Sequence, residues 1–519
     1  MLSKIKSCGL MGIDGFIINV ETDISNGIPS FEIVGLGDIA VKEAKERVRT
    51  AIKNARYEFP VKRITVNLAP ANLRKEGSAL DLPIAMGILA CTGQIDSSLV
   101  KDCIFIGELS LDGDIKGVNG VLSMALCAYH EGIGNIILPA DNADEAAVVE
   151  GLNVFPAKNI SDIVLHLNGH LRIKKHVIEI RNIFCNDSDN NSDNDNDNEI
   201  SGDDFCEVCG QENVKRVLEI AAAGFHNLMM VGPPGSGKTM LARRLPSILP
   251  PLTFDEALEV TRIYSIAGIL PTKTPLITAR PFRSPHHTIS TAGLVGGGKY
   301  PKPGEISLSH YGVLFLDEIP EFEKHTLEVL RQPLEDEIVT ISRLSASITY
   351  PAKTTLILAG NPCPCGYLTD ETKKCTCTYN QIQNYMGKLS GPLMDRVDLY
   401  VEAAPVKYKD LDSNPCGEKS KDIRQRVIKA RNIQLERYKN NKIFSNSQLN
   451  TGLIKKYCRL DNQCSLIMKN AFEKFGLSAR AYNRILKVAR TIADLDESEN
   501  VRAYHLAEAI QYRFTKAWK

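Results

Sequence analysis

A run of glycines closed by a lysine and a threonine is the stretch of this sequence with the clearest chemistry. Residues 232–239 read Gly-Pro-Pro-Gly-Ser-Gly-Lys-Thr, which is the G-x4-G-K-T pattern of a phosphate-binding loop, or P-loop. The glycines let backbone N–H groups curl around phosphate oxygens, and a helix that begins at the lysine adds the positive end of its dipole. Lys238 would reach the β and γ phosphates, and Thr239 would offer its hydroxyl to Mg²⁺. We therefore predict that ATP is bound by Gly232, Pro233, Pro234, Gly235, Ser236, Gly237, Lys238 and Thr239.

Two neighbouring acidic residues, Asp317 and Glu318, follow the apolar run Val313–Leu316. A carboxylate at the end of a buried strand can hold the water shell of Mg²⁺, and a second one beside it can orient the attacking water. An ordinary edge strand could give the same short pattern. This pair, however, lies 78 residues after Thr239, where it is the expected partner of the P-loop. We predict that Asp317 binds the metal and that Glu318 activates water.

Three further polar residues could complete a hydrolytic site. The apolar run Thr354–Ala359 ends at Gly360-Asn361. The amide of Asn361 could polarise the water or sense the γ-phosphate, and a turn-forming asparagine is the alternative. Arg396 and Arg480 could neutralise charge on the transferring phosphoryl group, often across a subunit boundary. Either arginine could instead form a surface salt bridge.

Four of the 14 cysteines are clustered in a short polar segment as C-x-C-x9-C-x-C, at Cys363, Cys365, Cys375 and Cys377. Four thiolates could close a tetrahedral Zn²⁺ site. The C-x-C spacing is tighter than the usual C-x2-C, so free thiols remain an equal alternative. A disulfide pairing is disfavoured in the reducing cytosol.

The elements that must position these residues suggest several domains. Over residues 205–405, strands that end in Gly or Asp alternate with helices, which predicts an α/β fold with a parallel sheet. Residues 1–170 mix short strands with two helical patterns and predict an α+β domain. Residues 171–204 are predicted to be an acidic flexible linker, because residues 186–204 hold eight acidic and no basic side chains and almost no apolar ones. Residues 420–519 predict a helical domain.

The predicted helical region is more positively charged than the rest of the chain. The whole sequence of 519 residues has 62 basic and 62 acidic side chains. From Lys421 to Lys519, 21 Lys and Arg stand against 9 Asp and Glu, a net charge of +12. Such a region permits a polyanionic partner, and an ordinary solvated helical surface explains it equally well.

Composition restricts where the chain works. No apolar run reaches the roughly 20 residues of a membrane-spanning helix, and Met1–Gly12 is too short and polar for a secretory signal. The scattered cysteines do not resemble a secreted disulfide framework. We expect a cytoplasmic protein with no membrane partner.

Several longer stretches resemble the ComM/YifB group of magnesium-chelatase-like AAA+ ATPases. They are Lys62–Gly77 (KRITVNLAPANLRKEG), Arg280–Ser290 (RPFRSPHHTIS), Pro303–Asp317 (PGEISLSHYGVLFLD), Asn361–Gly366 (NPCPCG) and Leu477–Leu495 (LSARAYNRILKVARTIADL). The resemblance covers nearly the whole chain except the acidic linker. It implies a Lon-protease-like N-terminal domain, an AAA+ core with chelatase-type insertions, and a helical lid. It also implies homo-oligomeric rings, as hexamers, that move DNA branches during recombination in natural transformation. In that group Arg396 would be the arginine finger, acting on a neighbouring subunit, and Arg480 the second sensor.

The N-terminal domain departs from a Lon-type protease. The Ser–Lys dyad of such proteases would fall on Ala79 and Leu122, and Ser78 is one residue out of place. Without a lysine to activate a hydroxyl, we predict no peptide cleavage.

The leading hypothesis is therefore an ATP-driven motor on single-stranded or branched DNA. The insertions Arg280–Lys299 and Ile338–Tyr350, the second carrying Arg343, would face the channel of such a ring. The alternatives are a magnesium-chelatase motor subunit, an ATP-dependent protease and a nucleotide-gated scaffold. Stimulation of the ATPase by DNA would separate the first from the others.

Overall fold

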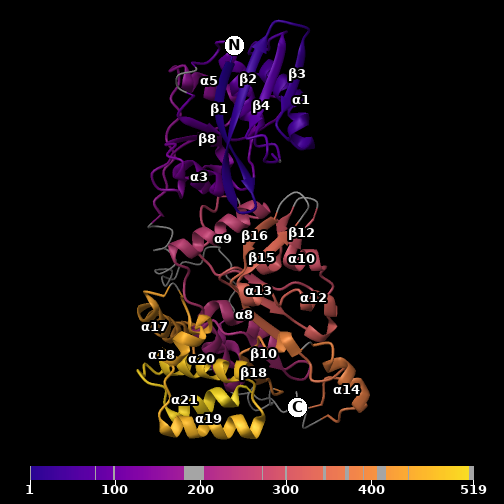
Figure 1. Ribbon diagram of the computed structural model, residues 1–519, viewed down its shortest axis with the longest axis vertical. Helices are drawn as coiled ribbons and strands as arrows, with labels where there is room; N and C mark the ends of the chain where they lie inside the picture. The colour runs from indigo at the N-terminus through magenta and orange to yellow at the C-terminus, as the bar shows by residue number, and fades with distance from the viewer. Residues whose placement is uncertain are drawn as a thin grey trace. The chain divides into compact units, whose positions relative to one another are not determined.

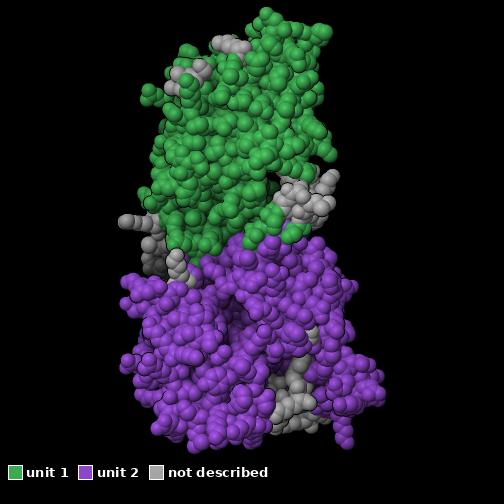
Figure 2. All heavy atoms as spheres, viewed as in Figure 1, with its two compact units in different colours: residues 1–193, 254–278, 342–350 green, residues 194–253, 279–341, 351–519 purple. Residues whose placement is uncertain are grey.

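A computed structural model describes most of the chain. The described residues are 2–75, 77–96, 100–180, 204–271, 273–298, 301–342, 347–368, 373–389, 391–405, 417–441 and 443–513. The chain forms two compact units (Figure 2). Unit 1 comprises Met1–Asp193, Phe254–Thr278 and Ser342–Tyr350, and unit 2 comprises Asn194–Thr253, Ala279–Ile341 and Pro351–Lys519.

Unit 1 is built on a seven-stranded mixed sheet with the order β3-β4-β2-β1-β5-β8-β9. Strands β1 and β2 form a long antiparallel pair, in which Leu2 faces Asp23 and Met11 faces Asp14, whereas β5, β8 and β9 run parallel. The strands are β1 (Leu2–Met11), β2 (Asp14–Ser25), β3 (Ser30–Val34), β4 (Arg63–Ala69), β5 (Cys103–Phe105), β8 (Asn135–Pro139) and β9 (Asn153–Ala157). The predicted α+β architecture is thereby confirmed.

The helices of unit 1 cover this sheet. They are α1 (Ile39–Asn54), α2 (Asp81–Cys91), α3 (Val121–His130), α4 (Ala143–Ala147), α5 (Ile160–Leu167) and α9 (Phe254–Ala267). Helix α1 buries only one face, and the Asp38 side chain caps its start by accepting the Val41 N–H. Every residue of α2 is buried. A helix surrounded by protein on all sides has no polar face, so it leaves no periodic signal in the sequence.

Helix α9 belongs to unit 1 although it lies far along the chain. It packs against α3, and its Arg262 donates to the Ile13 carbonyl at 2.8 Å, to Asp14 Oδ1 at 2.9 Å and to Ser123 Oγ at 3.2 Å. The segment after α8 (Lys238–Ile248) therefore leaves unit 2, forms one helix of unit 1, and returns.

Unit 2 contains a five-stranded sheet with the order β11-β14-β17-β10-β18, in which every neighbouring pair is parallel (Figure 1). Its strands are β10 (Leu228–Val231), β11 (Phe282–Arg283), β14 (Val313–Leu316), β17 (Thr355–Gly360) and β18 (Leu399–Glu402). Strands β10, β14 and β17 are buried along their whole length, as expected for a sheet covered on both faces. Because the strands are parallel, the loops that follow β10, β14 and β17 meet at one edge.

Helices α7 (Glu212–Gly224) and α8 (Lys238–Ile248) flank this sheet. The shorter helices of unit 2 are α10 (Thr291–Val295), α11 (Glu305–Leu308), α12 (Lys324–Glu328), α13 (Pro333–Asp336), α14 (Tyr379–Met386) and α15 (Gly391–Met394). Among the described residues, three two-stranded sheets complete the fold. In unit 1, β6 (Glu108–Leu109) pairs with β7 (Ile115–Lys116). Further along the chain, β12 (Gly296–Gly297) pairs with β13 (Lys302–Pro303), and β15 (Ile338–Ser342) pairs with β16 (Ser347–Pro351). The last pair is the predicted hairpin. Arg343 lies outside the described residues.

The C-terminal part of unit 2 is helical, as predicted. Its helices, shown in yellow and light orange in Figure 1, are α17 (Ser420–Tyr438), α18 (Thr451–Tyr457), α19 (Asn462–Phe475), α20 (Ala479–Leu495) and α21 (Ala503–Gln511). Their apolar faces join α7, α8 and the parallel sheet in one continuous hydrophobic cluster. The C-terminal helices are therefore packed as part of unit 2.

The predicted linker, 171–204, is described only at its ends. At its start, the His176 N–H donates to the Val154 carbonyl at 2.9 Å and His176 Nε2 lies 2.7 Å from Asp144 Oδ1. Residues 181–203 lie outside the described residues. In the part of the chain that the structure describes, no helix is long and apolar enough to cross a membrane.

Candidate nucleotide site and cysteine cluster

The predicted P-loop connects β10 to α8. Gly235 and Gly237 have φ angles of +78° and +81°, in the left-handed region that glycine adopts without steric cost. Lys238 opens α8 and is buried. Its Nζ donates to the Gly232 carbonyl at 2.8 Å and to the Pro233 carbonyl at 3.0 Å. The loop thus wraps the ammonium group that should bind phosphate.

The acidic pair follows β14 and faces the P-loop. Thr239 Oγ1 donates to Asp317 Oδ2 at 2.5 Å, so the two predicted Mg²⁺ ligands lie side by side. Burial lowers the pKa of Lys238, and the charges of Asp317 and Glu318 oppose that shift. These two carboxylates therefore lie close enough to act on the lysine electrostatically.

Asn361 follows β17, the strand between β14 and β10. Lys238 Nζ donates to its Oδ1 at 3.3 Å, and the N–H of Gly232 donates to the Gly360 carbonyl at 3.3 Å. The amide accordingly lies beside the P-loop, as the predicted γ-phosphate sensor would require. The structure brings Lys238, Thr239, Asp317 and Asn361 together through hydrogen bonds, with Glu318 next to Asp317.

The two predicted arginines lie together elsewhere in unit 2. Arg396 and Arg480 line one small pocket of about 80 Å³ with Glu335, Asp395 and Arg484. The Arg396 guanidinium donates to Glu335 and to the Pro392 carbonyl. Among the described residues, neither arginine forms a hydrogen bond or an ion pair with the P-loop of its own chain.

Two residues that the sequence did not assign to the nucleotide site also contact it. Gln211 Nε2 donates to the Ser236 carbonyl of the P-loop at 3.2 Å and to the Ala404 carbonyl beyond β18. His287 Nδ1 lies 3.7 Å from Glu318 Oε2. The His-His pair was visible in the sequence, but its position beside the acidic residue depends on the pairing of β11 with β14.

The four clustered cysteines lie in the segment between β17 and α14. Their sulfur atoms are all within 4.8 Å of one another. Cys363 Sγ lies 3.4 Å from Cys365 Sγ and 3.7 Å from Cys375 Sγ, and the Cys365 N–H donates to Cys377 Sγ at 3.4 Å. These distances are far longer than the roughly 2.05 Å of a disulfide bond, so the four thiols are free to bind a metal.

The two residues at the positions of a Lon-type dyad, Ala79 and Leu122, pack inside unit 1 and carry no reactive group. Ala79 and Leu122 are buried, and the Leu122 N–H donates to Glu145 Oε1 at 2.8 Å. Ser78 donates its hydroxyl to Glu108. The hydroxyl nearest to the expected nucleophile is thus bonded to a carboxylate and has no lysine partner.

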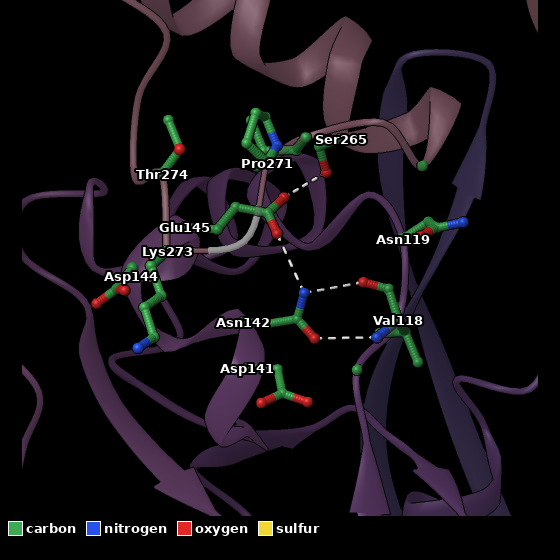
Figure 3. Close-up of a pocket in the computed structure, with 13 residues that line it drawn as sticks. Val118, Asn119, Asp141, Asn142, Asp144, Glu145, Ser265, Pro271, Lys273 and Thr274 are labelled. Atoms are coloured by element: carbon green, nitrogen blue, oxygen red, sulfur yellow. Dashed lines mark hydrogen bonds between the residues drawn. The ribbon is translucent and has the colours of Figure 1, made fainter. Parts of the chain in front are cut away.

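A pocket of about 190 Å³ opens next to Leu122 within unit 1 (Figure 3). Glu145 points toward Ser265 of α9, which donates to it, and toward Asn142, whose Nδ2 lies 3.2 Å from Glu145 Oε2. Asn142 in turn exchanges two 2.9 Å hydrogen bonds with the backbone of Val118. Burial raises the pKa of Glu145, against the lowering effect of its hydrogen bonds. This network fastens α9 to the N-terminal sheet domain.

Comparison with known proteins supports the assignment of the whole chain. Three family profiles match: "Magnesium chelatase, subunit ChlI" over residues 204–411, "Subunit ChlI of Mg-chelatase" over 20–142, and "Magnesium chelatase, subunit ChlI C-terminal" over 417–513. The competence protein ComM of Haemophilus influenzae is 43% identical over 515 residues, covering 99% of this chain and 97% of that protein. The chain belongs to the ComM/YifB group of magnesium-chelatase-like AAA+ ATPases.

Other members of the ComM/YifB group match over the same length. YifB of Escherichia coli is 42% identical over 514 residues, covering 99% of this chain and 97% of that protein. The magnesium-chelatase subunit ChlI of Euglena gracilis is 25% identical over 181 residues, covering 30% of this chain and 52% of that subunit. The AAA+ fold and the use of ATP with Mg²⁺ follow from membership of the ComM/YifB group, and the described site has the residues for both.

Proposed function

We propose that this chain is an ATP-driven motor that moves on single-stranded or branched DNA, as a branch-migration helicase in recombination during natural transformation. The observation that carries the proposal is the likeness over 99% of the chain to a relative named as a competence protein. Hydrolysis at the site of Lys238, Asp317 and Glu318 supplies the energy.

The working form proposed is a homo-oligomeric ring, a hexamer. Arg396 and Arg480 share a pocket, and in the part of the chain that the structure describes they form no hydrogen bond or ion pair with the P-loop. An arginine that is absent from its own nucleotide site can complete the site of a neighbouring subunit, as trans-acting arginine fingers do. Assembly would then be required for full activity.

The DNA-binding surface proposed uses basic residues that are not already engaged inside the protein. Several lid arginines are internal: Arg437 and Arg490 both donate to the buried Asp494. Arg283 in the first insertion is held by Glu305 through hydrogen bonds of 2.6 and 2.8 Å. Exposed basic side chains remain at Lys455, Lys456, Arg459, Lys469 and Lys474. These exposed side chains are candidates for contact with phosphates.

The test is DNA-stimulated ATP turnover. The assembled protein should hydrolyse ATP faster with single-stranded or branched DNA than without, and DNA affinity should fall steeply with salt because phosphate contacts release counterions. Arg343→Ala, predicted from the sequence alone, should lose the stimulation and keep basal turnover. A turnover rate that no form of DNA changes would refute the motor.

The cofactors proposed are ATP and Mg²⁺ at the P-loop, with Zn²⁺ as a second metal at the four cysteines. Mg²⁺ would be held by Thr239 and Asp317, whose oxygens form a 2.5 Å hydrogen bond with each other, and would supply positive charge to the transferring phosphoryl group. Hard oxygen ligands suit Mg²⁺ and soft thiolates suit Zn²⁺. The two metals therefore need not compete.

A magnesium-chelatase motor subunit is the second candidate, favoured by the names of the three matching family profiles. The ChlI relative of Euglena gracilis covers only 30% of this chain, whereas the match to ComM covers 99% of it. Porphyrin-dependent ATP turnover that DNA leaves unchanged would favour this candidate.

A further inference from the structure

The four-cysteine cluster adjoins the nucleotide site. Its first arm, Cys363 and Cys365, begins two residues after Asn361, which accepts a hydrogen bond from Lys238. Gly366, the next residue of this arm, lies against the P-loop: a methyl group added to its Cα would come within 2.5 Å of Pro234 Cδ. The cluster is thus connected to the loop after β17 through Asn361 and to the P-loop after β10 through Gly366.

The sulfur geometry fits one zinc ion. Four ligands at the usual Zn–S distance of about 2.3 Å on a tetrahedron have their sulfurs about 3.8 Å apart. The Sγ separations among Cys363, Cys365 and Cys375 are 3.4, 3.5 and 3.7 Å, which approach that edge length. A multi-iron cluster would hold its sulfurs further apart, since several metal and sulfide ions would lie between them. The tight C-x-C spacing is therefore no obstacle to a tetrahedral set.

The local backbone is arranged around the cluster. Cys363 is fully buried, and its carbonyl accepts the Gly366 N–H at 2.9 Å, which closes a tight turn. Gly366 has a φ of +83°, a conformation that suits glycine and permits the close approach to Pro234. The second arm, Cys375 and Cys377, ends at Thr378, whose side chain caps α14. A metal at the four sulfurs would join these two arms into one rigid piece.

We propose that the four thiolates bind a structural Zn²⁺, and that this zinc positions Asn361 and the P-loop for ATP hydrolysis. The metal has no part in the chemistry. It cross-links the two arms, which keeps Gly366 seated on Pro234 and holds the end of β17 in register with the P-loop. The inference rests on the ATP site and not on the proposed movement along DNA.

The first experiment measures the metal. Full-length protein purified without chelators should contain about one zinc per chain, and Cys375→Ser should lose it. Growth with cobalt should give the visible absorption of a tetrahedral thiolate site, which reports coordination without any activity assay. Cys206 and Cys209 form a C-x2-C pair outside the cluster, and both are free thiols. Cys209→Ser is therefore the matched control and should keep the metal. Iron in place of zinc, or no metal at all, would overturn the assignment.

The second experiment tests the link to the P-loop. Chelation of the zinc should raise the KM for ATP and lower kcat, by about tenfold or more together, and reloading with zinc should restore both. Gly366→Ala should keep its zinc and show the same defect, because the new methyl group displaces the turn from Pro234. Gly476→Ala is the control: Gly476 also has a positive φ, +60°, but a methyl group there would meet open space. Unchanged KM and kcat after complete, reversible zinc removal would overturn the positioning role, whether or not DNA stimulates the enzyme.

Discussion

Glu318 has a backbone conformation that glutamate rarely adopts. Its φ of +50° lies in the left-handed region, where a side chain with a Cβ is strained. Its N–H donates to Asp317 Oδ1 at 2.9 Å, which helps to hold the strained turn. Such strain persists where the surrounding structure enforces it, and it is concentrated at functional sites. The strained conformation thus falls on the residue that the sequence predicts to activate water.

We expect Glu318→Gln to bind ATP as tightly as the unchanged protein and to lose most of its turnover. The amide keeps the shape of the side chain but cannot accept a proton from water, and such a loss is of the order of 10²–10⁴-fold. Nucleotide affinity from a fluorescent ATP analogue and phosphate release from the same preparation give the two readouts. Lys238→Ala is the contrasting variant, since it should lose binding as well. Turnover near that of the unchanged protein would remove Glu318 from its proposed role.

The Ser78 hydroxyl allows a direct test of the N-terminal domain. We expect no cleavage of an unfolded protein substrate, with or without ATP, because Ser78 donates to Glu108 and Leu122 stands where a lysine would be needed. Gel analysis of an unfolded substrate is sufficient. Cleavage that survives Lys238→Ala and disappears in Ser78→Ala would show that the domain is a protease.

At the scale of elements, Asp398 joins the start of β18 to the lid. This buried carboxylate accepts the Asn227 N–H at 3.1 Å, next to the start of β10, and the Arg484 guanidinium of α20. His226 Nδ1 lies 3.4 Å from it. Burial would raise the pKa of Asp398, but Arg484 and then His226 outweigh that effect and hold the pKa well below its usual range. The folded protein therefore retains the ionised form.

We predict that Asp398→Asn lowers the free energy of unfolding by about 3 kcal/mol at neutral pH, because it leaves Arg484 without its buried partner. A carboxyl whose pKa is lowered by folding stabilises the protein above its unfolded pKa of about 3.9, and that stability is lost as the pH falls further. The difference between the two proteins should be constant from about pH 7 to pH 5 and shrink below about pH 4. Chemical denaturation across this range measures it. A difference independent of pH throughout would contradict the electrostatic explanation.

Short sequence patterns were enough to predict the strands that lead into the nucleotide site. The P-loop, the acidic pair and the asparagine each follow an apolar run directly, so β10, β14 and β17 could be placed before their order was known. Helix α2 was not predicted, because all of its faces are buried and it has no amphipathic period. The net charge of the lid was visible, but the use of Arg437 and Arg490 to neutralise Asp494 depends on helix packing. The same limit applies to Gln211, whose partner Ala404 is 193 positions away.

At the scale of the whole molecule, the position of Arg396 decides whether ATP hydrolysis needs a neighbouring subunit. If Arg396 acts on a neighbouring subunit, ATP turnover should rise with protein concentration. Neither Arg396→Ala nor Lys238→Ala should be active alone, and a mixture should regain some turnover because some interfaces would contain an intact Lys238 facing an intact Arg396. Phosphate release across a series of mixing ratios measures this. Failure to regain turnover at every ratio would show that Arg396 acts within its own chain.

The chain passes between the two units five times, at 193/194, 253/254, 278/279, 341/342 and 350/351. A single cut in the predicted acidic linker would therefore not yield two self-sufficient domains. The N-terminal fragment would lack α9, and the C-terminal fragment would carry that helix with Arg262 and Ser265 deprived of Asp14 and Glu145. The C-terminal fragment would hold all of unit 2 and also the parts of unit 1 that the N-terminal fragment lacks. The two fragments, produced as separate polypeptides, should associate and restore unit 1, as the fragments of a split reporter protein do.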